Sequence, residues 1–195
     1  MLYVWIRQLF RIIFATFFRW KVDGLHHVPS EGSVVVCANH ISYLDPPLIG
    51  CAIRRKVHFM AKEELFSAPV LGSVVPKLGA FPVKRGEGDR QALKTSIRIL
   101  KESKVLGIFP EGTRSKTGEP GKPHMGAALI ALKTNSPIIP TAIIGPYRLF
   151  RPVRIVFGKP IDVSPYIQGK VNSEAASAVT EQMMEQIKQI METYR

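Results

Sequence analysis

Short apolar runs alternate with helical patterns along this chain, and this alternation constrains its fold more than any other feature. The runs are short, continuous and rich in β-branched residues, which is typical of buried strands. We predict strands at 33–38 (SVVVCA), 57–60, 79–85, 104–109, 137–144 and 153–157. We predict helices from Pro46 onward, at 63–78 with breaks at Pro69 and Pro76, and at 89–102, 125–134 and 173–194. This order predicts an α/β fold with a mixed, largely parallel sheet flanked by helices.

The length of the chain fits one folded unit behind a short amino-terminal segment. A chain of 195 residues with 46% apolar residues can bury a core without disulfides. Its two cysteines, Cys37 and Cys51, do not form a disulfide framework, and a reducing compartment is expected. We therefore divide the chain into a membrane-associating segment, 1–22, and one domain, 23–195.

Residues 1–20 (MLYVWIRQLFRIIFATFFRW) are the most hydrophobic and aromatic part of the chain. Arg7, Arg11 and Arg19 interrupt the segment, and an arginine near a bilayer centre costs roughly 2.5–3.5 kcal/mol on insertion scales. A spanning helix is therefore not predicted. On a helix, Arg7 and Arg11 form a narrow cationic stripe beside a wide apolar face, which favours a helix lying in an anionic membrane interface. The alternative is a helix packed on the core of its own domain.

The formal net charge of +12 favours a polyanionic partner, such as anionic lipid or a phosphorylated substrate. A charge that serves only solubility is the simpler explanation. The sequence contains no zinc-ligand spacing, no RNP-like aromatic run and no basic helix with heptads, so no nucleic-acid partner is expected.

A histidine and an aspartate follow the predicted strand 33–38, in the run NHISYLD. Imidazole can act as a base near neutral pH, and a carboxylate that fixes its tautomer makes it more effective. A tight loop can bring His40 and Asp45 together, because Pro46 keeps Asp45 out of the α region. In the alternative interpretation, Asp45 only caps the helix at Pro46. A metal site at His40 is not expected, because no second His or Cys lies at ligand spacing.

Two further segments place basic residues after predicted strands. Phe109–Ser115 reads FPEGTRS, in which Gly112 permits a turn and Arg114 offers a fork suited to phosphate oxygens. Glu111 is either an acceptor for a substrate hydroxyl or an internal partner that orients Arg114. Gly79–Arg85 reads GAFPVKR and ends at a second arginine, Arg85, which could also be an ordinary surface charge.

Together these segments resemble the 1-acylglycerol-3-phosphate acyltransferases, also called lysophosphatidic acid acyltransferases. The resemblance rests on Asn39–Asp45, Gly79–Arg85, Phe109–Ser115 and the proline-containing run 138–142, with support from 61–66 (AKEELF). It covers about residues 22–160. It implies the glycerolphosphate acyltransferase-like fold and transfer of an acyl chain from acyl-CoA or acyl-carrier protein to lysophosphatidate, which gives phosphatidate.

The resemblance also implies roles for particular residues. His40 would be the general base and Asp45 its orienting carboxylate, acting without an acyl-enzyme, a metal or a cofactor. Substrate binding would fall to Lys62, Arg85, Glu111, Gly112, Thr113 and Arg114. The enzyme would sit at the cytoplasmic face of the cell membrane, in contact with anionic lipid.

Three alternatives remain open on the sequence alone. The acceptor could be glycerol 3-phosphate or another lysophospholipid, because the same base and cations would serve it. The chain could be a non-catalytic module that binds anionic lipid. It could also be a cysteine hydrolase that uses Cys37 and His40, although side chains three residues apart near a strand should face opposite sides of the sheet.

Overall fold

A computed structural model describes residues 1–84, 88–115, 117–167 and 172–194. Within these residues one seven-stranded sheet has the order β1-β7-β6-β2-β5-β3-β4. The strands are β1 (Lys21–Asp23), β2 (Val34–Ala38), β3 (Val57–Lys62), β4 (Phe81–Val83), β5 (Val105–Ile108), β6 (Ile138–Ile144) and β7 (Arg154–Phe157). β6 and β7 pair antiparallel, whereas the other neighbouring strands pair parallel. The predicted α/β class, with a mixed and largely parallel sheet, is confirmed.

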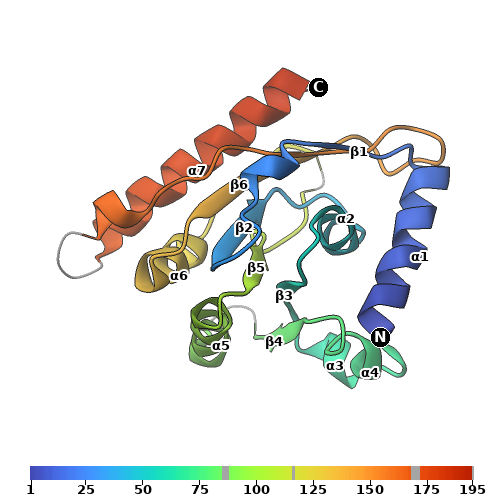
Figure 1. The fold of residues 1–195 in the computed structure, drawn as a ribbon. Coiled ribbons are helices and arrows are strands. Elements are labelled where there is room, and N and C mark those ends of the chain that lie inside the picture. Colours follow the sequence, from blue (N-terminus) through green and yellow to red (C-terminus); the bar gives the residue numbers. More distant parts are fainter. Residues whose placement is uncertain (85–87, 116, 168–171, 195) are drawn as a thin grey trace.

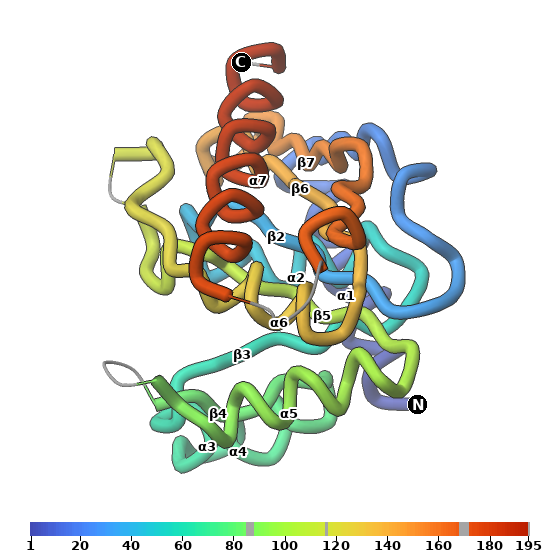
Figure 2. The backbone as a smooth tube through the Cα atoms, turned by 90° about the vertical axis from the view of Figure 1, so that its left-hand side faces the viewer, coloured from blue at the N-terminus to red at the C-terminus, as the bar shows by residue number. Residues whose placement is uncertain are grey.

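Helices cover both faces of the sheet (Figure 1). They are α1 (Leu2–Phe17), α2 (Asp45–Ala52), α3 (Glu64–Ser67), α4 (Leu71–Val74), α5 (Arg90–Lys101), α6 (Gly126–Thr134) and α7 (Ser173–Tyr194), with 3₁₀ turns η1 (Leu25–His27) and η2 (Ser164–Tyr166). One face is covered by α5, α6 and α7, and the other by α2, against which α1 packs. Figure 2 shows α7 in front of β6, the strand on which it packs.

The central strand β2 shows why the sheet needs helices on both sides. All five of its residues are buried, so it reads as a continuous apolar run. Alternate side chains face opposite layers: Val35 and Cys37 join the cluster under α5, α6 and α7, and Val34 and Val36 join the one under α2. Burial of each such valine side chain stabilises the fold by roughly 1.5–3 kcal/mol.

Two parts of the sheet region differ from the sequence prediction. β1 was not predicted, because a three-residue strand with mixed side chains has no periodicity to detect. It exists through its parallel pairing with β7, which is more than a hundred residues away in the chain. The predicted helix 63–78 is reduced to the single turns α3 and α4, because β3 continues to Lys62 and Pro69 separates the turns.

Helix α1 is packed on the domain along one side and exposed along the other. Phe14 is fully buried, whereas Trp5, Leu9 and Ile12 are more than half exposed. The Arg7 guanidinium donates to the carbonyls of Cys51, Ile53 and Arg54 at the carboxyl end of α2, where carbonyls lack helical partners.

The predicted cationic stripe is therefore divided: Arg7 is bound to the domain, whereas Arg11 is exposed. The two alternatives for α1, a helix packed on its own domain and a helix in the membrane interface, each describe one of its faces. One face packs on the domain through Arg7, and no described residue covers the other, apolar face. Among the described residues, no helix combines the length and the apolar character needed to cross a bilayer.

Candidate active site

The candidate site forms where β2 and β5 end, at the carboxyl edge of the parallel part of the sheet. The two strands are hydrogen-bonded neighbours, so the segments that follow them, 39–45 and 109–115, begin side by side. The His40 and Phe109 rings stack with centroids 4.0 Å apart and an interplanar angle of 17°. The Ser115 amide donates to the His40 carbonyl at 2.7 Å. Sheet topology thus joins two of the predicted segments.

His40 and Asp45 make the contact that the sequence predicts. The distance between His40 Nδ1 and Asp45 Oδ2 is 2.7 Å. The Asp45 side chain is fully buried, and the His40 side chain is 13% exposed. Because a carboxylate accepts at Nδ1, the neutral imidazole carries its proton there and presents the Nε2 lone pair to an approaching group. This geometry suits a general base.

The Asp45 carboxylate is held by donors from three directions. Oδ2 accepts the backbone amides of Ile41 and Ser42, each at 2.7 Å, as well as the imidazole. Oδ1 accepts the Tyr147 hydroxyl at 2.7 Å. Asp45 lies in the first turn of α2, but the amides it accepts belong to the preceding loop and not to the helix. The interpretation of Asp45 as only a helix cap is therefore wrong.

Tyr147 was missed by the sequence analysis. It follows β6, which pairs with β2 on the side away from β5, and its hydroxyl donates to a residue 102 positions earlier in the chain. Burial and the neighbouring Asp45 carboxylate raise the pKa of Tyr147 above its usual range. The phenol therefore remains protonated and remains a donor at neutral pH. No local pattern in the sequence marks it.

Glu111 is buried and connects the histidine loop to a later part of its own loop, between β5 and α6. One carboxylate oxygen accepts the His40 backbone amide at 3.1 Å, and the other accepts the Gly121 amide at 2.8 Å. The residue is only 5% exposed. It is the internal partner that the sequence allowed, but it holds the His40 backbone and not Arg114.

Two of the predicted cations, Lys62 and Arg114, are exposed at the surface. Arg114 is exposed; it donates to the Tyr43 hydroxyl at 2.8 Å and stacks over the Tyr43 ring at 3.5 Å. Lys62 is exposed at the end of β3, which borders β5 and ends at the same edge of the sheet. Thr113 is exposed as well. Arg85, the remaining predicted cation, lies outside the described residues.

Gly112 allows the turn that separates Glu111 from Arg114. Its φ is +67°, and its amide donates to the Phe109 carbonyl at 3.0 Å. A β-carbon at this position would come within 3.4 Å of the His124 ring. Glycine adopts this conformation without the penalty that other residues incur, so the buried Glu111 and the exposed Arg114 can follow one another closely.

Cys37 has no role in this site. Its thiol is fully buried in the layer under α5, α6 and α7, and burial raises its pKa well above the usual range. A thiol that stays protonated is a poor nucleophile, so the cysteine-hydrolase alternative is not supported. In the parts of the chain that the structure describes, no group of three or more His, Cys, Asp or Glu side chains is arranged to hold a metal ion.

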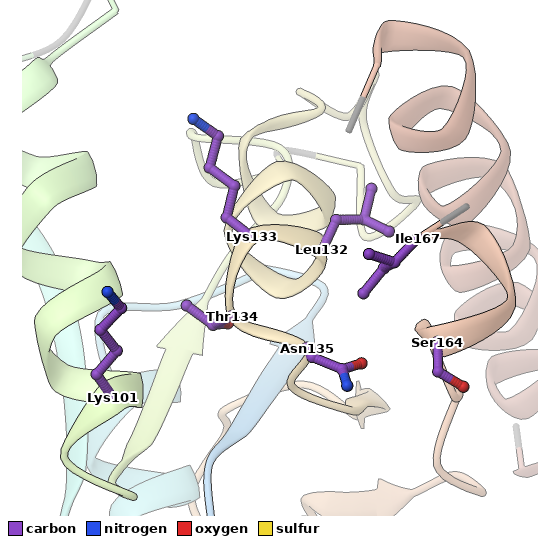
Figure 3. A pocket seen from close by; sticks show the side chains of 7 residues that line it. All are labelled: Lys101, Leu132, Lys133, Thr134, Asn135, Ser164 and Ile167. Atoms are coloured by element: carbon purple, nitrogen blue, oxygen red, sulfur yellow. The ribbon is translucent and has the colours of Figure 1, made fainter. Parts of the chain in front are cut away.

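A separate hollow lies on the helical layer, at the opposite edge of the molecule. It is lined by Lys101, Leu132, Lys133, Thr134, Asn135, Ser164 and Ile167 (Figure 3). Lys101 and Thr134 end α5 and α6, whereas the candidate site lies near the beginnings of helices, where strands end. None of the predicted site residues lines this hollow.

Comparisons with known proteins point to one family. A family model described as Acyltransferase matches residues 19–144. The 1-acyl-sn-glycerol-3-phosphate acyltransferase of Bacillus subtilis (strain 168) is 32% identical over 176 residues, which are 87% of each chain. The protein of the same name from Streptococcus pneumoniae is 30% identical over an alignment that covers 98% of this chain and 74% of that protein.

One solved structure is similar over almost the whole chain. The crystal structure of the 1-acyl-sn-glycerophosphate acyltransferase PlsC from Thermotoga maritima aligns with a TM-score of 0.76 and 27% sequence identity. The alignment covers 99% of this chain and 80% of that one. The fold described above is therefore the fold of that protein.

Proposed function

The chain belongs to the acyltransferase family, and from this premise we propose that it acylates 1-acylglycerol 3-phosphate. The acyl chain comes from a thioester, and the product is phosphatidate. The names of the relatives in Bacillus subtilis and Streptococcus pneumoniae support this acceptor. The observation that carries the proposal is the 2.7 Å contact between His40 Nδ1 and the fully buried Asp45 carboxylate, beside exposed cations.

The proposed chemistry is direct transfer with His40 as the base. Nε2 takes the proton of the free acceptor hydroxyl while the hydroxyl oxygen attacks the thioester carbonyl carbon. The carbon–sulfur bond then breaks, and the imidazolium returns the proton to the leaving thiolate. Asp45 fixes the tautomer and stabilises the imidazolium, as the carboxylate of a catalytic triad does. The nucleophile is the substrate, so no acyl-enzyme forms.

Cationic side chains would hold the phosphate of the acceptor. Arg114 is proposed as the principal contact, with Lys62 and Arg85 as further contacts and Thr113 as a hydroxyl donor. Phosphate binding would position the hydroxyl at Nε2, and such positioning can remove several kcal/mol of the barrier. Glu111 and Gly112 would act by shaping the segment that carries Arg114.

Acyl-CoA or acyl-carrier protein is the proposed donor, and no metal or redox cofactor is required. Both donors are anionic, which suits a chain with a net charge of +12. The exposed apolar face of α1 would hold the enzyme on a bilayer containing anionic lipid, where its acceptor is found. We propose the cytoplasmic face of the cell membrane as its location.

The decisive experiment measures thiol release from acyl-CoA with lysophosphatidate as acceptor. We expect His40→Ala to reduce turnover by about a thousandfold or more, because general-base catalysis is lost, with an unchanged circular dichroism spectrum. His26→Ala, at an exposed histidine outside the site, is the matched control. Normal turnover in His40→Ala would refute the role of His40.

The same assay separates the acceptors and the alternative function. Mass spectrometry of products from lysophosphatidate, glycerol 3-phosphate and other lysophospholipids identifies the preferred alcohol. Lysophosphatidate is expected to give the highest kcat/KM. A protein that binds anionic vesicles but releases no thiol with any acceptor would instead be a non-catalytic lipid-binding module.

A further inference from the structure

The turn after β6 exposes two large apolar side chains at its tip. Leu149 is 64% exposed and Phe150 is 62% exposed, although leucine and phenylalanine side chains are usually buried in a core. Phe150 also has a φ of +61°, a left-handed conformation that a bulky residue rarely adopts. The backbone is thus held in a costly conformation that keeps an apolar ring near the surface, and core packing does not account for this arrangement.

The base of this turn is fixed. A β-carbon at Gly145 would come within 2.6 Å of the Pro152 carbonyl oxygen, so the two ends of the turn lie in close contact. Within it, the Arg148 backbone amide donates to the Pro146 carbonyl at 2.8 Å, and the Arg151 backbone amide donates to the Arg148 carbonyl at 3.0 Å. Leu149 and Phe150 therefore project from a closed, hydrogen-bonded turn.

The turn is joined to the end of α1. The Phe150 amide donates to the Phe17 carbonyl at 2.6 Å, and the two rings have centroids 6.4 Å apart. The Val153 amide donates to the Phe18 carbonyl. In Figure 1 the turn and α1 lie on the same side of the molecule. The apolar tip therefore continues the exposed apolar side of α1.

Positive charge surrounds this surface. Arg148 and Arg151 flank the tip, and Arg19 and Lys21 follow α1; all four are exposed, and none forms an ion pair within the described residues. No Asp or Glu occurs in residues 1–22 or 120–161. The nearby Asp23 is already paired with Arg154 at 2.7 Å. Apolar side chains ringed by unpaired cations complement anionic headgroups over acyl chains.

We propose that Leu149 and Phe150 form a second membrane-inserting element, which binds an anionic bilayer together with the exposed face of α1. Arg148 and Arg151 contact the lipid phosphates, and the two apolar side chains enter the acyl boundary. With one contact along α1 and another at this turn, the protein has a fixed orientation on the bilayer. A contact through α1 alone would let the protein rotate about the helix axis. Tyr147, the donor to Asp45, lies in this turn two residues before Leu149, so docking brings the bilayer close to the catalytic pair.

The test measures binding of the full chain to vesicles of phosphatidylcholine with 30% phosphatidylglycerol, without substrates. We expect Leu149→Ser with Phe150→Ser to weaken binding about tenfold, because two apolar side chains no longer leave water. The matched control is Val70→Ser with Leu71→Ser, which removes an exposed apolar pair (78% and 47% exposed) that follows the acidic Glu63 and Glu64 in the chain. The control should change binding less than twofold. Equal losses in both variants, or none in the first, would overturn the proposal.

A second measurement does not depend on how the serine variant folds. An environment-sensitive fluorophore on Leu149→Cys labels selectively, because Cys37 and Cys51 are buried and burial raises the pKa of Cys51 to about 11. Its emission should shift to the blue with the anionic vesicles and not with pure phosphatidylcholine, and a label on Val70→Cys should not respond. An unchanged label at 149, or the same response to both vesicles, would contradict insertion into an anionic bilayer. Because no substrate is present, either result is independent of the proposed acyl transfer.

Discussion

The two halves of the candidate site are built differently. In the buried half, His40, Asp45 and Glu111 are held by short hydrogen bonds to backbone amides and to Tyr147. In the exposed half, the Arg114 guanidinium is hydrogen-bonded to Tyr43, and Lys62 is exposed at a strand end. The difference indicates that the groups proposed for proton transfer are preorganised, whereas we expect the groups proposed for phosphate binding to become fixed only when the substrate binds. Substitutions in the two halves should therefore change different kinetic constants.

Asp45→Asn should give the largest effect in the buried half. An amide would keep the shape but could not stabilise the imidazolium, and it would favour the wrong imidazole tautomer. We expect kcat to fall by about 10³–10⁴-fold, the range known for triads, with a small change in KM. Steady-state kinetics test this, with Asp162→Asn at an exposed position as control. A fall of less than tenfold would show that proton transfer does not depend on Asp45.

Glu111→Gln should have a smaller effect, because it disturbs the backbone of His40 and not the imidazole itself. One of the two backbone amides would lose its acceptor, a change worth about 1–3 kcal/mol when buried. We expect a lower melting temperature and a 10–100-fold decrease in kcat. Thermal unfolding and kinetics are measured together, with the exposed Glu64→Gln as control. Unchanged stability with a raised KM would instead indicate that Glu111 contacts the acceptor.

Arg114→Ala tests the exposed half. Loss of a charge-assisted contact to phosphate should raise KM for lysophosphatidate about tenfold or more and leave kcat within a fewfold. Arg114→Lys should restore part of the affinity, because it keeps the charge but not the planar fork. Arg98→Ala, exposed on α5, is the control. An effect confined to KM for the thioester donor would place Arg114 in the donor site.

Tyr147→Phe should have the smallest effect. Asp45 would lose one donor and keep its two backbone amides, so we expect a two- to tenfold lower kcat. The carboxylate, less neutralised by hydrogen bonds, would hold the imidazolium more strongly. The acidic side of the kcat/KM profile should therefore move to higher pH. Tyr166→Phe, whose hydroxyl meets Gln182 on the surface, is the control. An unchanged pH profile of kcat/KM would show that Tyr147 contributes only to packing.

The sequence could predict the part of the site that is local. His40 and Asp45 share one loop of seven residues, and the carboxylate reaches the imidazole and two amides without help from distant elements. The partners of Glu111 and Asp45 from other loops were not predictable. The His40 amide reaches Glu111, and the Tyr147 hydroxyl reaches Asp45, only because the ends of the parallel strands β2, β5 and β6 lie at one edge of the sheet.

Helix α1 shows the same limit outside the site. Its periodicity marks an amphipathic helix, but periodicity alone does not say which face meets the domain. The structure turns Arg7 inward, where the carboxyl end of α2 offers unpaired carbonyls, and leaves Trp5, Leu9 and Ile12 exposed.

By itself, then, the sequence determined the α/β class, the strand-end segments and the His40–Asp45 pair, because strand and helix patterns and loop contacts depend on near neighbours in the chain. The tertiary structure alone decided the position of β1, the inward turn of Arg7, the role of Glu111 and the contact from Tyr147. These depend on which distant segments the sheet brings together, and that is a property of the whole packed chain.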